Sequence, residues 1–323
     1  MFDTVIAFIA AALIQAIPLL YGATGEILTE KSGNLNLGIP GIMYVGGISG
    51  IIGGFAYEHF ALETNAVLLI LIPLLSTLIG SALMSLIYCF LTVTLKANQN
   101  VTGLALTTLG VGIGNFFGGS LVKLFGESGS IQLPQCKEVY KATFPFMTEV
   151  GDLANTGFLF YLAFIIAIAA AFFLKRTKAG LNLRSVGEAP ATADAAGINV
   201  TLYKYMATCI GGAIAGLGGL YFVMDYTGGA WTNEGFGDRG WLAIAIVIFA
   251  LWKPNLAIIS SVVFGGLYIA EVKIPGLSGA IKEMIKMLPY LVTIIVLVIT
   301  SARKKRENQP PESLGLSYFR EER

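Results

Sequence analysis

Long runs of apolar residues, separated by short charged connections, restrict the fold of this chain more than any other feature of its sequence. A helix needs about 20 predominantly apolar residues to cross a hydrocarbon core of roughly 30 Å. Runs that approach this length lie at 2–21, 37–57, 65–95, 98–118, 157–174, 205–224, 240–252, 255–271 and 284–301. The sequence therefore predicts an all-α fold, a polytopic transmembrane helical bundle of about nine spans.

The overall composition supports this prediction. Hydrophobic residues make up 55% of the chain and charged residues only 13%, so a soluble domain of 323 residues could not bury all of its apolar surface. The net charge is +1, which gives no basic excess of the kind that binds nucleic acid. We expect the apolar surface that the chain cannot bury to contact membrane lipid.

The distribution of basic residues predicts the orientation. Short loops rich in Lys and Arg stay in the cytoplasm, and most of the 21 basic residues fall on one side if the N-terminus is outside. This model divides the chain into a transmembrane domain, 1–301, and a cytoplasmic tail, 302–323. Within the domain, the loop 175–204 is cytoplasmic and the segment 119–156 is extracytoplasmic.

Two of the runs are unusually rich in glycine and polar residues for helices that face lipid. The second run contains seven glycines between Gly38 and Gly54, counting both, and the fourth opens with Asn98-Gln99-Asn100 and also contains Asn115. Broken, glycine-rich helices at membrane depth line cavities or pack against protein. We expect such broken helices and a translocation pathway here, and close helix packing is the alternative.

Motifs of catalysis and energy coupling are absent from the sequence. It has no GxxxxGK[ST], HExxH or GxSxG motif, and Cys89, Cys136 and Cys209 have no CxxC spacing. The predicted spans also contain no series of Asp, Glu or His residues for proton relay. We therefore expect no enzyme activity and no metal site, and an ion-coupled secondary transporter remains a less favoured alternative.

The loop 175–204 is predicted to contain a short helix at 188–197. Pro190 suits a first helical turn, Glu188 complements the positive end of the helix dipole, and Gly197 suits the C-terminal end. Such a short helix is marginal alone in water, so it needs a surface to lie on. That surface is either the chain's own bundle or a groove on a partner protein, and we favour the partner.

The same segment carries a family resemblance. RSVGEAPATADAAGINV, at 184–200, resembles the coupling-helix loop of permease subunits of ATP-binding-cassette (ABC) importers, in the branch for simple sugars, branched-chain amino acids and nucleosides. The stretches 25–43, 98–113 and 218–254 also resemble that branch. The tail around Leu314 to Tyr318 resembles the nucleoside-type subunit, which works with a binding protein of the basic-membrane-lipoprotein kind.

The resemblance implies a multi-pass subunit of an importer in the bacterial cytoplasmic (inner) membrane. Its implied partners are a related second permease, an ABC ATPase with two nucleotide-binding domains that binds ATP and Mg, and an extracytoplasmic substrate-binding lipoprotein. This chain itself would bind no cofactor. Sugar permeases of the branch have an additional N-terminal span and a more acidic motif at 34–38, so nucleosides are the expected substrate, and a ribose-like sugar or a branched-chain amino acid is the alternative.

Two sets of residues are the candidates for function. The resemblance implies that coupling to the ATPase involves Glu188, Ala189, Pro190, Ala193, Asp194 and Gly197. Amide side chains can hydrogen-bond a ribose or a base edge without burying a charge. On that ground the candidate pathway residues are Asn34, Asn36, Asn98, Gln99 and Asn115.

Overall fold

The computed structural model describes residues 2–124, 131–141, 156–273, 278–303 and 309–320. In these ranges the chain is helical, with one isolated β-bridge between Gln132 and Ala230. The helices are α1 (Phe2–Glu30), α2 (Ile39–Phe60), α3 (Ala66–Cys89), η1 (Phe90–Thr94), α4 (Gln99–Leu124), α5 (Pro134–Tyr140), α6 (Phe158–Arg176), α7 (Lys178–Glu188), α8 (Pro190–Ala195), α9 (Val200–Tyr221), η4 (Phe222–Tyr226), α10 (Arg239–Phe249), α11 (Pro254–Lys273) and α12 (Gly279–Arg303). The predicted all-α class is confirmed for the described residues.

Six helical segments in the described part of the chain are long and apolar enough to cross a membrane. They belong to α1, α2, α3 with η1, α4, α6, and α9 with η4. Two shorter apolar helices, in α10 and α11, lie beside them, and α12 packs against both. A multi-spanning membrane protein is thus supported, while the number of nine spans stays a prediction.

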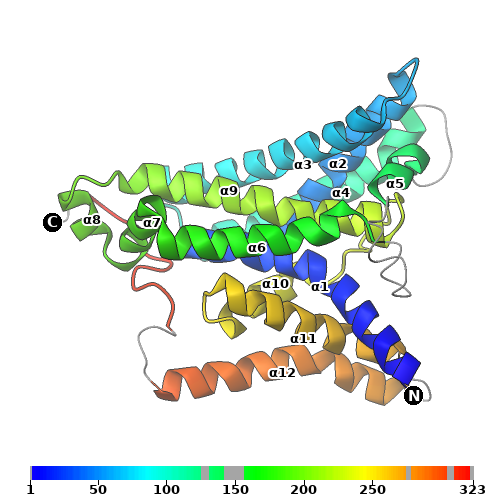
Figure 1. Cartoon of the computed structure of the whole chain (residues 1–323). Coiled ribbons are helices and arrows are strands. Elements are labelled where there is room, and N and C mark those ends of the chain that lie inside the picture. The colour runs from blue at the N-terminus through cyan, green and yellow to red at the C-terminus, as the bar shows by residue number, and fades with distance from the viewer. Residues whose placement is uncertain (1, 125–130, 142–155, 274–277, 304–308, 321–323) are drawn as a thin grey trace.

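The long helices run side by side between two ends of the molecule, as Figure 1 shows. α7, α8 and the C-terminal tail gather at one end, which we call the α8 end. α5 and the N-terminus lie at the other, the α5 end. Of the predicted extracytoplasmic segment 119–156, residues 125–130 and 142–155 lie outside the described residues.

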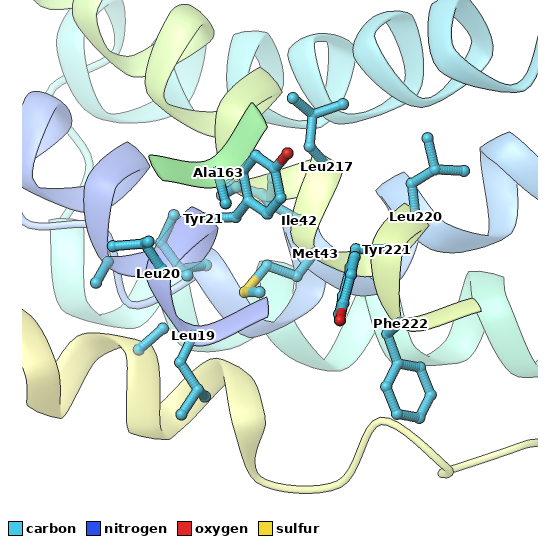
Figure 2. Packing of buried hydrophobic residues seen from close by; sticks show 14 of the residues in the cluster. Leu19, Leu20, Tyr21, Ile42, Met43, Ala163, Leu217, Leu220, Tyr221 and Phe222 are labelled. Atoms are coloured by element: carbon cyan, nitrogen blue, oxygen red, sulfur yellow. The ribbon is translucent and has the colours of Figure 1, made fainter. Parts of the chain in front are cut away.

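Close helix packing around α9 forms the centre of the bundle. α9 contacts α1, α2 and α3, and Tyr21, Met43 and Leu217 from three of these helices meet in the core (Figure 2). A Cβ atom added at Gly46 would lie 2.5 Å from the Cα of Gly216, so these helices touch backbone to backbone. Small residues permit this approach in membrane proteins.

The expectation of a broken, glycine-rich second span is wrong. α2 is one continuous helix from Ile39 to Phe60, and its glycines face neighbouring helices, which is the packing alternative. The irregular turns lie elsewhere, in the π-helical segments η1 and η4 that follow α3 and α9.

The first helix extends nine residues beyond the predicted end at 21. The added part contains Glu26 and Glu30, which end the apolar run in the sequence. Both carboxylates have partners in the fold, because the backbone N–H of Asn36 donates to Glu26 and the indole N–H of Trp252 donates to Glu30. Partners distant in sequence therefore let the helix continue where local apolarity stops.

The loop 175–204 contains α7 as well as the predicted short helix. The Thr177 side chain caps α7 by accepting a hydrogen bond of 3.0 Å from the Gly180 backbone N–H. Leu183 and Val186, three residues apart, are buried on one face. The capping threonine and this spacing could have indicated the helix, but Gly180 and Gly187 favoured a loop.

Candidate functional site

α8 is a short helix at the α8 end with one buried and one exposed face. Pro190 occupies its first turn, as predicted, and Gly197 beyond its end has a left-handed backbone with φ of +83°. Glu188 is the last residue of α7, so the helix is shorter than the predicted 188–197. The exposed face consists of small side chains: Ala191, Thr192, Ala195 and Ala196.

The predicted coupling residues divide between the two faces. Glu188 and Ala189 are exposed, whereas Ala193 is only 3% exposed and packs in a small cluster with Val186 and Val200. We predicted that Ala193 contacts a docked partner, but its burial gives it a role in internal packing.

Lys31 lies near Glu188 at the same end of the bundle. Burial lowers the pKa of Lys31, and the charge of the Glu188 carboxylate raises it.

The C-terminal tail, residues 309–320, is fastened to α8 and α7. The Tyr318 hydroxyl donates a 2.8 Å hydrogen bond to the Asp194 carboxylate, and Arg320 Nε lies 3.2 Å from the same oxygen. The Ser313 hydroxyl donates to the carbonyl of Gly187 at 2.6 Å. The sequence resemblance included the tail but did not place it on α8, since nothing local in the tail indicates these partners.

The connection between α1 and α2, residues 31–38, brings three predicted pathway residues together. Asn34 Nδ2 donates to the Thr208 hydroxyl at 3.0 Å, and Asn36 Oδ1 accepts from the Gly38 backbone N–H at 2.9 Å. Gln99 Oε1 accepts from the Leu35 backbone N–H at 2.7 Å. Asn34, Asn36 and Gln99 are all buried, so they hold the backbone of this connection inside the bundle.

Unpaired polar atoms cluster at the same connection. Glu26 Oε2, Asn34 Oδ1 and Asn36 Nδ2 are buried and have no hydrogen-bond partner among the described residues. Buried polar atoms usually have a hydrogen-bond partner. These three atoms can therefore form hydrogen bonds with a polar ligand or with ordered water. Sequence reasoning missed Glu26 and Glu30, although their spacing of four residues placed them on one face of a continuing helix.

Asn98 and Asn115 do not join this cluster. Asn98 is exposed, and its side chain accepts from the Val101 backbone N–H at 3.0 Å, which caps the start of α4. Asn115 accepts a 2.7 Å hydrogen bond from the Tyr44 hydroxyl. That hydroxyl accepts in turn from the backbone N–H of Glu234, in the segment between α9 and α10. The five predicted pathway residues thus occupy three places.

α4 has an exposed outer face with a shallow groove of about 720 Å³. The helix surface is depressed in the middle of the groove, because the small residues Ala105, Thr108 and Gly112 share one side of the helix there. Phe116 and Phe117 close the groove toward the α5 end. Thr102 and Thr107 face inward, and the Thr107 hydroxyl donates to the carbonyl of Leu37 at 2.8 Å.

Comparison with known proteins gives a match over most of the chain. The family model described as "Branched-chain amino acid transport system / permease component" matches residues 8–297. No solved structure gave a significant match.

Curated relatives match over nearly their whole length. The nucleoside ABC transporter permease protein NupC of Lactococcus lactis is 29% identical over 98% of each chain. The guanosine ABC transporter permease protein NupQ of Bacillus subtilis is 31% identical over 98% of this chain and 97% of its own. The putative glucose ABC transporter permease protein TsgC13 of Haloferax volcanii is 30% identical over 96% and 97%. The permeases NupP and NupB of the two bacterial species are more distant, at 22% and 19% identity over 91% and 87% of this chain and 81% and 76% of their own.

Proposed function

Since the chain belongs to the family of permease components of branched-chain amino acid transport systems, we propose that it is the membrane subunit of an ABC importer for nucleosides. Nucleosides are proposed as the substrate because the chain is similar over nearly its full length to NupC and NupQ, which are named as nucleoside and guanosine permeases. The family resemblance noted in the sequence is confirmed, and the protein is a multi-pass protein of the bacterial cytoplasmic membrane.

In the proposed topology the chain crosses the membrane nine times, through α1, α2, α3, α4, α6, α9, α10, α11 and α12. The α8 end is cytoplasmic and the α5 end is outside, so the N-terminus is outside and the tail inside. The basic cluster of Lys175, Arg176 and Lys178 at the α8 end supports this orientation, because such residues remain in the cytoplasm.

The proposed complex contains a second permease, an ABC ATPase with two nucleotide-binding domains, and a substrate-binding lipoprotein. ATP and Mg would bind on the ATPase. The occurrence of NupB beside NupC in one species, and of NupP beside NupQ in another, supports a second, related permease as partner. The groove on α4 is a surface on which a helix of that permease can pack.

Coupling to ATP hydrolysis is proposed to act through the exposed face of α8. This face is preceded in the chain by Glu188, Ala189 and Pro190. Its position on the bundle is proposed to be fixed by Ala193, Asp194 and Gly197. The ATPase would carry α8 with it as its nucleotide-binding domains close. The tail and α7 would then transmit this motion to the connection 31–38.

The proposed pathway uses the polar groups of that connection. Asn34, Asn36 and Gln99 lie together near the α8 end, and the unpaired atoms of Asn34 and Asn36 can hydrogen-bond a ribose or a base. Asn115 would contribute at the α4 side, and Asn98 would act only as the cap of α4.

A sugar is the second candidate substrate, because TsgC13 is named as a putative glucose permease and is about as similar as the nucleoside permeases. The test is uptake into proteoliposomes that contain this chain, its partner permease, the ATPase and the lipoprotein. Labelled guanosine should accumulate only with ATP. Uptake of glucose or ribose without guanosine would transfer the assignment to the sugar importers.

Docking through α8 is tested by Thr192→Arg. Thr192 is exposed on α8, so an arginine there would remain unpaired in an interface while the bundle folds normally. The ATPase should fail to co-purify. Thr64→Arg, at an exposed threonine of the α5 end, is the matched control and should retain the ATPase. Equal retention of the ATPase by both variants would exclude α8 as the docking helix.

A further inference from the structure

An apolar groove of about 590 Å³ opens on the surface where α6, α7 and α9 meet. Its floor is formed by the buried residues Leu28, Ala170, Leu183 and Ala207. Its walls are formed by exposed apolar side chains, including Leu202, Met206 and Ile210 of α9. The small side chains of Ala169 and Ala170 on α6 leave room for the groove beside α9.

The length of the groove corresponds to one leaflet of a bilayer. On α9 its lining extends from Leu202 to Ile214, which at about 1.5 Å per residue is roughly 18 Å. The hydrocarbon core is roughly 30 Å thick, so one leaflet contributes about 15 Å. A spanning helix of a partner would cover both leaflets, whereas a single acyl chain covers only one.

Basic residues lie at the α8 end of the groove. Arg176 follows the groove residue Phe173 by one helical turn, and Lys178 precedes the groove residue Ala179. Both are exposed, and Lys175 is exposed beside them. No acidic residue occurs between Phe158 and Gly187. A phosphate group at this position would therefore meet the positive charge of Arg176 and Lys178, with no carboxylate contributed by α6 or by α7 up to Gly187.

We propose that this groove binds an anionic phospholipid, with an acyl chain along α9 and the phosphate against Arg176 and Lys178. The proposal rests on the proposed topology, which puts the α8 end in the cytoplasmic leaflet. Because α7 forms one side of the groove and continues directly into α8, the bound lipid also fixes the position of the coupling helix.

The test is native mass spectrometry of the full chain with phosphatidylglycerol or phosphatidylcholine. Phosphatidylglycerol should bind in preference, and Arg176→Gln with Lys178→Gln should reduce its binding about tenfold or more. The control pair is Lys137→Gln with Lys141→Gln at the α5 end, which should leave binding unchanged. Equal binding of the two lipids, or an effect of the control pair equal to that of the groove pair, would overturn the proposal.

A second pair of variants tests the groove itself. Ala169 is exposed and lines the groove, so Ala169→Trp should fill it and reduce binding of phosphatidylglycerol. Ile168 is its exposed neighbour outside the lining, and Ile168→Trp should bind as the wild type does. Unchanged binding in Ala169→Trp would overturn the proposal.

A photo-crosslinker at Met206 in the assembled complex separates lipid from protein as the occupant. It should capture lipid, and capture of the partner permease would overturn the proposal. These readouts need no transported substrate, so they stand whether or not the chain carries nucleosides.

Discussion

The outer faces of α3 and α4 are both exposed, but their side chains differ. The exposed residues of α3 are large and aliphatic, among them Leu71, Leu75, Ile79 and Leu83. α4 is the least apolar of the six spanning segments, yet less than half of its most apolar stretch is buried. Its outer face also has exposed large residues such as Leu104 and Leu109, but between them and beside them lie the small residues Ala105, Thr108 and Gly112.

This difference shows that an exposed face on a single membrane chain can contact either lipid or a helix of another protein. Lipid requires no shape complementarity, so a face that stays in lipid can be uniformly aliphatic, as on α3. Small residues in a row on an exposed helix permit the backbone of another helix to approach. We therefore propose that the outer face of α3 contacts lipid and that the outer face of α4 contacts the second permease.

The largest expected effect comes from placing a charge on the α3 face. Ile79 is 59% exposed near the middle of α3, and Ile79→Lys should cost about 3 kcal/mol for a lysine in lipid. The abundance of the chain in membranes, measured by immunoblotting, should fall strongly. Ile79→Leu is the control and should match the wild type. Normal abundance of Ile79→Lys would mean that protein covers this face, and the contrast with α4 would fail.

A smaller effect is expected from filling the groove on α4. Gly112→Trp adds a large ring at a position where a Cβ atom added to the glycine would meet no neighbouring helix within 4 Å, so the chain should fold as before. Overpacking of the interface should cost about 2 kcal/mol, which is roughly a thirtyfold loss of affinity for the partner permease.

The measurement for Gly112→Trp is co-purification of the two permeases. The matched variant on α3 is Leu83→Trp, at a residue that is 55% exposed, and it should retain the partner. If Leu83→Trp released the partner and Gly112→Trp retained it, the two faces would have to be exchanged in our assignment.

The smallest effect concerns the inner edge of α4, where Asn115 joins Tyr44. Tyr44→Phe removes the hydroxyl that donates to Asn115 and accepts from Glu234, so we expect a loss of about 1 kcal/mol in stability and of about 2 °C in Tm. Tyr57→Phe removes an exposed hydrogen bond to Asn65 and should leave Tm unchanged. Lost transport with unchanged Tm in Tyr44→Phe would show that this hydrogen bond serves the proposed pathway and does not stabilise the fold.

Much of the helical pattern could be predicted from apolar runs alone. The run 157–174 corresponds to α6, and the run 255–271 corresponds to α11, each within two residues of its ends. These helices consist of apolar residues throughout most of their length, so the local sequence contains the information that determines them.

The rest depends on contacts between distant segments. The extension of α1 to Glu30 requires the indole of Trp252, and the inward face of Ala193 requires Val186 and Val200. The candidate pathway residues were selected by side-chain type, which does not reveal that Asn98 serves as a cap or that Asn115 lies apart from Asn34. A single sequence does not specify such pairings.

The fastening of Asp194 by Tyr318 and Arg320 has a consequence for biosynthesis. A ribosome makes α8 more than 100 residues before it makes its two partners in the tail, so the carboxylate has neither of them until the tail has been made. During that interval α8 lacks these two contacts, although Ala193 can already pack with Val186 and Val200. A chain without the tail would therefore present an α8 whose Asp194 has lost both of these partners, and we expect such a chain to dock the proposed ATPase less well than a chain with the tail.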